Sequence, residues 1–265
     1  MTKSNQGILS ILYGGNSASH AMGDETSTIP NQRLEFTLKG ASIKIIGDSI
    51  AAGAGTSDSI KTDEVILQIG EQVFLRRSST KSWSYLFTSY IADKFPGSKV
   101  INNGCGGITS TQVRDNLSAL YSEEDDIIIV MLGSNDRKQQ NGMEILFNNL
   151  TFMVRFFKEK NKKVILMSSN PSTVSNELYP NRLYHKEDVN NVIACVADNE
   201  EVLFISHYNY IQDYLLLTEK TIDEIMTEKN CMNDGLHPTD TVHYLMFRNI
   251  IQSLDLGIKI KEATW

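Results

Sequence analysis

Short apolar runs, each stopped by small or polar residues, recur along the chain at intervals that leave room for a helix between them. Such runs are typical of strands buried on both faces of a parallel sheet. They predict five strands, at Ser42–Ile46, Lys99–Asn102, Asp126–Leu132, Val164–Met167 and Val202–Ile205. Apolar residues spaced three and four apart predict intervening helices, at Trp83–Phe95, Thr109–Leu120, Met143–Lys160 and Asp188–Asp198, and a last one at Thr239–Leu254.

This alternation of strands and helices favours right-handed β-α-β units. We therefore predict an α/β protein, a three-layer α/β/α sandwich around a central, mostly parallel five-stranded sheet. The pattern shows no linker, so residues 41–265 are expected to form one domain, with residues 1–40 as an arm packed on it. Leu34–Leu38 alternates apolar and polar residues like an edge strand. Two apolar runs around Gly70-Glu71-Gln72 predict a hairpin insertion at 64–77.

Composition narrows the classes of partner. The net charge is -7 over 265 residues, without a concentration of Lys and Arg, which argues against binding to nucleic acid or to an anionic membrane. The three cysteines lie far apart, with no spacing typical of a zinc or redox site. The apolar stretch Ile8–Tyr13 is too short to span a membrane and lacks a signal-peptide pattern. These features predict a cytoplasmic protein without a membrane span; they leave its oligomeric state open.

Polar corners follow three of the predicted strands, at Gly47-Asp48-Ser49, at Asn103–Gly107 and at Gly133–Asp136. The carboxyl ends of parallel strands share one edge of the sheet, where α/β proteins bind ligands. Late in the chain, Asp234-Gly235-Leu236-His237-Pro238 places a carboxylate and an imidazole three residues apart. A serine nucleophile needs a base and a group that orients the base, so these segments together are candidates for a site with a nucleophilic serine.

Each corner also has an ordinary structural interpretation. Asn135 and Asp136 are good helix-capping residues, and the glycines at 104, 106 and 107 suit a tight turn. The histidines at positions 20, 185, 207 and 243 have no companion residues in the sequence and are interpreted as structural or exposed. It is the joint occurrence of polar corners at three strand ends and a late Asp-x-x-His that favours a site.

These residues resemble the SGNH hydrolases, also called GDSL esterases and lipases, in all four signature blocks and in the family's order. Gly-Asp-Ser is matched at 47–49, and Asn-x-Gly-x-x-Gly-x-Thr at Asn102, Gly104, Gly107 and Thr109. Gly-x-Asn-Asp is matched at Gly133, Asn135 and Asp136, and Asp-x-x-His-Pro at 234–238. Ile50 replaces the leucine of the nominal motif, and Ser134 fills a place often taken by threonine. The resemblance implies a flavodoxin-like SGNH hydrolase fold.

The resemblance also implies a role for each matched residue. Ser49 corresponds to the nucleophile, His237 to the general base and Asp234 to the residue that orients it. The oxyanion donors would be the Ser49 N–H, the Gly107 N–H and the Asn135 side-chain amide. Neither a metal nor a cofactor is expected to take part.

The leading hypothesis is a serine esterase that removes a small acyl group, with acetyl on a carbohydrate as the preferred substrate. A lysophospholipase or thioesterase acting on longer acyl chains is the nearest alternative, and the hairpin residues Ile66, Ile69 and Phe74 would then line its acyl channel. Acyl transfer to an alcohol other than water would use the same residues. A non-catalytic glycan-binding module with the same fold is a hypothesis of a different class.

Overall fold

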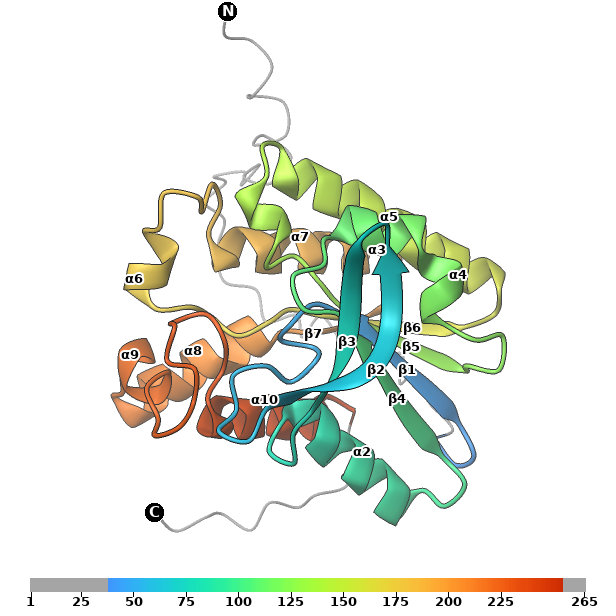
Figure 1. The fold of residues 1–265 in the computed structure, drawn as a ribbon, viewed down its shortest axis with the longest axis horizontal. Helices are drawn as coiled ribbons and strands as arrows, with labels where there is room; N and C mark the ends of the chain where they lie inside the picture. Colours follow the sequence, from blue (N-terminus) through green and yellow to red (C-terminus); the bar gives the residue numbers. More distant parts are fainter. Residues whose placement is uncertain (1–37, 255–265) are drawn as a thin grey trace, which may run out of the picture. The chain divides into compact units, whose positions relative to one another are not determined.

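The computed structural model describes residues 38–254, and its elements are labelled as in Figure 1. The strands are β1 Ser42–Gly47, β2 Ile60–Ile69, β3 Gln72–Ser78, β4 Lys99–Gly104, β5 Ile127–Met131, β6 Lys163–Met167 and β7 Leu203–Ile205. The helices are α2 Trp83–Lys94, α3 Ser110–Asp115, α4 Leu117–Leu120, α5 Gly142–Glu159, α6 Val174–Glu177, α7 Lys186–Asn199, α8 His207–Thr218, α9 Ile222–Ile225 and α10 Asp240–Ser253. A short 3-10 helix, η1, spans Asp136–Lys138.

Five strands form the central sheet in the order β4-β1-β5-β6-β7, and each neighbouring pair runs parallel. After β1 the chain crosses to β4 and then returns to β5 on the other side of β1. This order is the flavodoxin-like one, with its switch point between the carboxyl ends of β1 and β5, where such sheets bind ligands. Helices α3, α5 and α7 lie on one face, and α2, α8 and α10 on the other (Figure 1). The predicted three-layer fold is confirmed.

The core explains why the strand predictions hold. Every residue of β1 and β5 is buried, which is why β5 reads as an uninterrupted apolar run and β1 ends in one at Ile45-Ile46, although β1 also buries Ser42 and Lys44. Helix α5 presents Leu146, Leu150 and Met153 to this core, at the three- and four-residue spacing of one helix face.

One predicted helix is interrupted. The segment Thr109–Leu120 forms two helices, α3 and α4, because Asn116 between them leaves the helical conformation with φ −126° and ψ 23°. The Asn116 side chain donates a hydrogen bond to the Gln112 carbonyl, at 2.9 Å, and its backbone N–H bonds Val113. An asparagine side chain that competes in this way for backbone carbonyls closes a helix.

The hairpin β2–β3 is antiparallel and is held against the sheet domain by apolar side chains. Leu67 and Phe74 are buried in the main core cluster, with Ile66 and Ile69 packed against it. Arg76 of β3 donates to the carbonyl of Asn102, so the hairpin is also tied to the carboxyl end of β4. The expected arm at 1–40 falls outside the described residues except for its last three, and so does the expected edge strand at 34–38 except for Leu38.

Candidate active site

Ser49 lies at the switch point, two residues beyond the end of β1. The corner that carries it is fixed by its neighbour Asp48, whose N–H donates to the Met131 carbonyl of β5 at 3.2 Å. The Asp48 carboxylate is fully buried and accepts the N–H of Ile50 at 2.9 Å. Strand β1 therefore delivers Ser49, partly exposed, to the carboxyl edge of the sheet.

The segment Asp234–Pro238 folds as a tight turn around its own aspartate. The Asp234 Oδ1 atom accepts the N–H groups of Leu236 at 3.0 Å and His237 at 2.8 Å. Two side chains from the segment after β6 hold the turn in place. Asn176 donates to the Asp234 carbonyl at 3.1 Å, and Asn170 donates to the Leu236 carbonyl at 3.2 Å.

Three predicted site residues form one chain of hydrogen bonds. Ser49 Oγ lies 2.9 Å from His237 Nε2, and His237 Nδ1 lies 2.6 Å from Asp234 Oδ2. The His237 side chain is 15% exposed, so the imidazole is shielded but can be reached from solvent. An ionised Asp234 carboxylate can only accept hydrogen bonds. Its pairing with His237 therefore places the ring proton on Nδ1 and leaves Nε2 to accept the hydroxyl proton of Ser49.

The pKa of Asp234 lies below its ordinary value. Partial burial alone would raise the pKa, but it is outweighed by the hydrogen bond and charge of His237 and by the N–H donors of His237 and Leu236. The carboxylate is consequently ionised across the physiological pH range.

Close packing between two loops sets the distance between Ser49 and His237. Gly55, in the loop after β1, has a φ of +113°, and a Cβ atom built there would lie 2.2 Å from the Pro238 carbonyl oxygen and 2.9 Å from the His237 Cβ. Only glycine fits that position without displacing the histidine.

A buried histidine forms hydrogen bonds that hold the same loop in place. His243 of α10 accepts the Trp83 N–H at Nδ1, at 3.3 Å, and donates from Nε2 to the Ala54 carbonyl at 3.1 Å. Burial lowers the pKa of His243 to about 4, so the ring stays neutral. Trp83 in turn donates from its indole to the Ile50 carbonyl at 3.0 Å. His243 therefore has a structural role, and its hydrogen-bond partners come from segments far away in the sequence.

Two backbone N–H groups at these corners have no partner among the described residues. Within residues 38–254, the N–H groups of Ser49 and Gly107 have no hydrogen-bond acceptor. Gly107 has a φ of +88°, a conformation that glycine adopts at little cost. A Cβ atom on the neighbouring Gly106 would lie 4.0 Å from the Ser49 Cβ, which places this loop directly beside the serine.

The buried Asn135 side chain is oriented from both ends. Its Nδ2 atom donates one hydrogen to the Ile108 carbonyl at 2.9 Å, and its Oδ1 atom accepts from Lys138 Nζ at 2.9 Å. The second hydrogen on Nδ2 has no partner among residues 38–254. Asn135 therefore offers one free amide donor at the end of β5, across the switch point from Ser49.

Asp136 serves a neighbouring helix. Its carboxylate accepts the backbone N–H of Ser110, the first residue of α3, at 3.0 Å and the Ser110 hydroxyl at 2.5 Å. Burial raises the pKa of Asp136, and the charge of Asp48 adds to this effect, while the bonds from Ser110 oppose it. Asp136 thus fixes the corner after β5 relative to the one after β4.

Two lysines near these corners were missed by the sequence analysis. Lys138, which orients Asn135, lies three residues after it, so a search of the turn following the third block could have found it. Lys186, at the start of α7, is 3% exposed and donates to the hydroxyls of Ser134 at 2.6 Å and Ser169 at 2.7 Å. Burial lowers the pKa of Lys186 to about 7. No local pattern marks Lys186.

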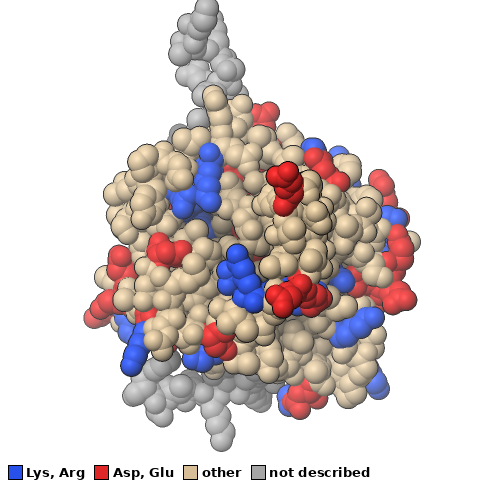
Figure 2. Space-filling view, in the orientation of Figure 1, with Lys and Arg blue, Asp and Glu red and all other residues tan. Residues whose placement is uncertain are grey.

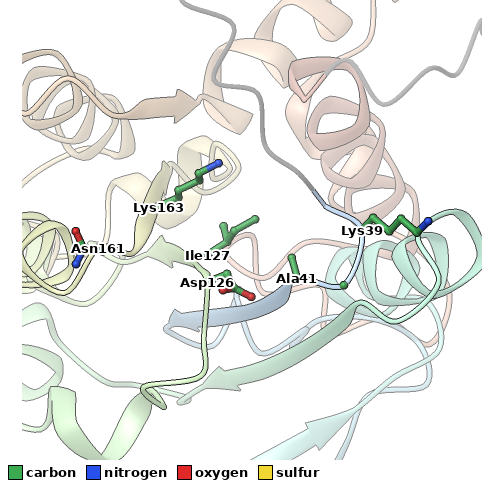
Figure 3. A pocket seen from close by; sticks show the side chains of 7 residues that line it. Lys39, Ala41, Asp126, Ile127, Asn161 and Lys163 are labelled. Atoms are coloured by element: carbon green, nitrogen blue, oxygen red, sulfur yellow. The ribbon is translucent and has the colours of Figure 1, made fainter.

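Two pockets lie away from this site. The one in Figure 3, of about 340 Å³, lies at the opposite, amino edge of the sheet and is lined by residues that include Lys39, Asp126 and Lys163. A second, of about 400 Å³, lies along α5 around Phe152 and Phe156. The His, Cys, Asp and Glu side chains of residues 38–254 form no group of three suited to a metal ion.

Charges on the surface are mixed. On the face shown in Figure 2, Lys and Arg side chains are interspersed with Asp and Glu side chains and form no continuous basic area. None of the helices within residues 38–254 combines the length and the apolar character needed to cross a membrane.

Comparison with solved structures shows the same fold in proteins of low sequence identity. A variant of an acetyl-xylooligosaccharide esterase from Geobacillus stearothermophilus superposes with a TM-score of 0.61 at 18% identity, over 82% of this chain and 94% of the other. An α/β hydrolase from the metagenome of Lake Arreo, Spain, gives a TM-score of 0.59 at 16% identity, over 82% and 96% of the two chains.

Comparison with curated proteins finds no match. The GDSL-like lipase/acylhydrolase family matches residues 45–245, a range that begins within β1 and ends within α10 and so spans most of the chain. The family predicted from the four blocks is confirmed: the chain belongs to the GDSL-like lipase/acylhydrolase family and is a carboxylic-ester hydrolase.

Proposed function

We propose that Ser49 is the nucleophile of this hydrolase, with His237 as general base and Asp234 as the residue that orients it. The observation that carries the proposal is the continuous chain of hydrogen bonds from Ser49 Oγ through the imidazole to the Asp234 carboxylate, with contacts of 2.9 and 2.6 Å. A nucleophile, a base within hydrogen-bond reach and a group that fixes the base are the parts that nucleophilic catalysis requires.

The proton transfers follow from the tautomer. As Ser49 Oγ attacks the ester carbonyl carbon, its proton moves to His237 Nε2, and the ionised Asp234 stabilises the imidazolium that results. His237 then gives the proton to the departing alcohol, leaving an acyl group on Ser49. Water, deprotonated by the same histidine, attacks the acyl carbon, releases the acid and restores the Ser49 hydroxyl.

The three free donors suit the oxyanion of the tetrahedral intermediate. The Ser49 and Gly107 N–H groups and the second Nδ2 hydrogen of Asn135 have no partners among the described residues. Donors held in place before the reaction stabilise developing negative charge without reorganisation. We assign all three to the oxyanion hole.

For the substrate, we propose a small acyl ester, preferably acetyl, on a carbohydrate. The solved relative described as an acetyl-xylooligosaccharide esterase supports this choice. The hairpin supports it too, because Phe74 is buried in the core and Ile66 and Ile69 pack against it. These side chains, which a channel for long acyl chains would need, are already used for packing.

Longer acyl chains are the second candidate, favoured by one observation. The segment 174–183 exposes four large apolar side chains; it begins directly after Thr173 and includes Asn176, two residues that anchor the Asp234 turn. They are Val174, Leu178, Tyr179 and Leu183, each more than half exposed. An exposed apolar group of this kind suits contact with a lipid tail.

The test is hydrolysis of p-nitrophenyl esters from acetate to long acyl chains by the native protein and by Ser49→Ala. We expect activity on short chains and a fall in kcat of at least about a thousandfold in the variant. Ser118→Ala, which changes an exposed serine on α4, is the matched control and should retain full activity.

The other outcomes separate the alternatives. A long-chain optimum would support the lysophospholipase or thioesterase hypothesis, and most activity remaining in Ser49→Ala would overturn the nucleophile assignment. If the native protein hydrolyses no ester of the series, the glycan-binding hypothesis gains support.

A further inference from the structure

Lys138 lies beside the proposed oxyanion hole and has hydrogen-bonding capacity to spare. The side chain is partly buried, and its ammonium group donates one hydrogen bond, to Asn135 Oδ1. An ammonium carries three donors, so two remain. Among the described residues, no carboxylate lies within ion-pair distance of Lys138. Lys138 is therefore a cation next to the reacting centre without a counter-ion.

Arg182 is a second cation without a counter-ion among the described residues, in a segment that is bonded to the one carrying Lys138: the N–H of Leu183 donates to the carbonyl of Arg137 at 3.0 Å. It donates to Asn181 Oδ1 at 3.1 Å, and its guanidinium lies 5.9 Å from the centre of the Tyr179 ring. Its Nε atom is buried and has no partner, and within residues 38–254 it forms no ion pair. The guanidinium is thus held by Asn181 and by the Tyr179 ring, while some of its N–H groups have no acceptor among the described residues.

The two cations act on each other. After burial itself, the charge of Arg182 is the largest influence that lowers the pKa of Lys138, and the charge of Arg137 follows. Arg137 is already neutralised by Glu177 at 2.7 Å. The buried Asp48 acts in the opposite direction, but more weakly than either arginine. The hydrogen bond from Leu183 to Arg137 brings the segments of Arg182 and Lys138 together, and the two like charges act on each other. An anion would stabilise such an arrangement.

We propose that Lys138 and Arg182 form a subsite that binds an anionic group, carboxylate or phosphate, carried by the ester substrate. The proposal rests on the proposed function, because the subsite is placed relative to the Asn135 amide. It names the substrate class more closely: an ester whose alcohol part is negatively charged, such as an acylated acidic sugar or a phosphate-bearing lipid. In a chain of net charge -7, two unpaired cations, one of them bonded to Asn135, would select such a substrate against neutral esters.

The test compares phenyl acetates that differ only in the para substituent. The probes are 4-acetoxybenzoate, which is anionic, 4-acetoxybenzamide, which is neutral, and 4-acetoxyphenyl phosphate. Arg182→Gln and Lys138→Met should each lower the ratio of kcat/KM for the anionic over the neutral probe by about tenfold. In Arg182→Gln we expect the loss to lie mainly in KM. The intrinsic reactivity of each ester is the same for all variants, so it cancels when the anionic-to-neutral ratio of a variant is compared with that of the native protein.

Lys99→Met is the matched control, since Lys99 is an exposed lysine at the amino end of β4, on the opposite edge of the sheet. Its ratio should equal that of the native protein. Raising the salt concentration should reduce the preference for the anion in the native protein and leave the neutral probe unaffected. A larger effect of the substitutions on the phosphate than on the carboxylate probe would indicate a phosphate-bearing substrate, and the reverse an acidic sugar.

Several results would overturn the subsite. One is an anionic-to-neutral ratio that is unchanged in Arg182→Gln, and another is an equal loss on both probes in Lys138→Met, which would show that Lys138 only orients Asn135. If these probes are hydrolysed equally well by Ser49→Ala, the proposed function fails instead. Should the native protein hydrolyse none of the probes, calorimetric titration with 4-hydroxybenzoate and 4-hydroxybenzamide gives the same comparison by binding. Equal affinities for the two compounds, or a preference for the anionic one that persists in Arg182→Gln, would refute the proposed subsite.

Discussion

The amino and carboxyl edges of the central sheet differ in how far their polar groups are paired by hydrogen bonds and ion pairs. At the amino edge, Asp125 accepts from the Ser42 hydroxyl at 2.9 Å and lies 3.6 Å from Lys44, and Asp126 accepts the Ser42 N–H at 2.8 Å. At the carboxyl edge, the N–H groups of Ser49 and Gly107 have no partner among the described residues. Gly107 is exposed and Ser49 partly exposed, so these two N–H groups are open to solvent or to a ligand.

This difference between the two ends of the strands indicates that one end serves stability and the other is available for function. Pairing at the amino edge contributes to stability, and the donors at the carboxyl edge, which we propose act on substrate, contribute no such pairing. Substitutions on the two edges should therefore separate stability from activity, and the following three predictions are ordered by expected effect.

Removing the buried acid of the amino edge should give the largest change. Asp125→Ala leaves Lys44 buried without a partner, with the two side chains only 1% and 7% exposed. We expect the free energy of unfolding to fall by about 3–5 kcal/mol, with kcat per folded molecule unchanged. Urea unfolding with an activity assay checks both. Glu124→Ala, which alters an 81% exposed neighbour, is the control and should change stability by less than about 0.5 kcal/mol.

Removing a free donor of the carboxyl edge should have the opposite signature. In Asn135→Ala we expect kcat to fall by about 100- to 1,000-fold, with KM little changed, because the amide would act on charge that develops in the transition state. Steady-state kinetics on p-nitrophenyl acetate provide the measurement, and Asn148→Ala, an exposed amide on α5, is the control. A raised KM at unchanged kcat would remove Asn135 from the oxyanion hole.

Lys186 offers a pH-dependent test, in which the change in stability per pH unit is smaller than the effects above. Its pKa in the folded protein is about 7, against an ordinary 10.5, so between these values the unfolded chain binds a proton that the folded one does not. The stability of the native protein should thus rise relative to Lys186→Met as pH increases from 7 to 10, by at most about 1.4 kcal/mol per pH unit.

Urea unfolding at several pH values measures this slope. Lys229→Met, at an exposed lysine, should reproduce the pH profile of the native protein. A slope that is identical in the native protein and Lys186→Met would show that the buried lysine keeps its proton throughout.

The sequence predicted the fold class because the buried strands are short, apolar and separated by amphipathic helices. It also predicted which segments meet: β1, β4 and β5 run parallel, so the corners that follow them share an edge. Asn116 escaped prediction because its effect depends on a side-chain bond to Gln112, which no periodicity reveals.

The supporting side chains were out of reach for a related reason. Lys186 and Ser134 are 52 residues apart, and the segments of Lys138 and Arg182 meet only through the hydrogen bond from Leu183 to Arg137. Such pairs are set by tertiary packing, so a single sequence carries no local signal for them. The roles of Ser49, Gly107, Asn135, Asp234 and His237 remain proposals for the experiments above.

The separation of Ser49 and His237 along the chain also has a consequence for biosynthesis. The two residues are 188 positions apart, and the turn that carries His237 is anchored to the segment after β6. A nascent chain that has already formed β1, β4 and β5 therefore carries Ser49 without His237, the base that we propose for it. Long-range contacts of this kind form late in folding, because the chain entropy lost in closing them is large. The appearance of esterase activity during refolding should accordingly lag behind the appearance of secondary structure.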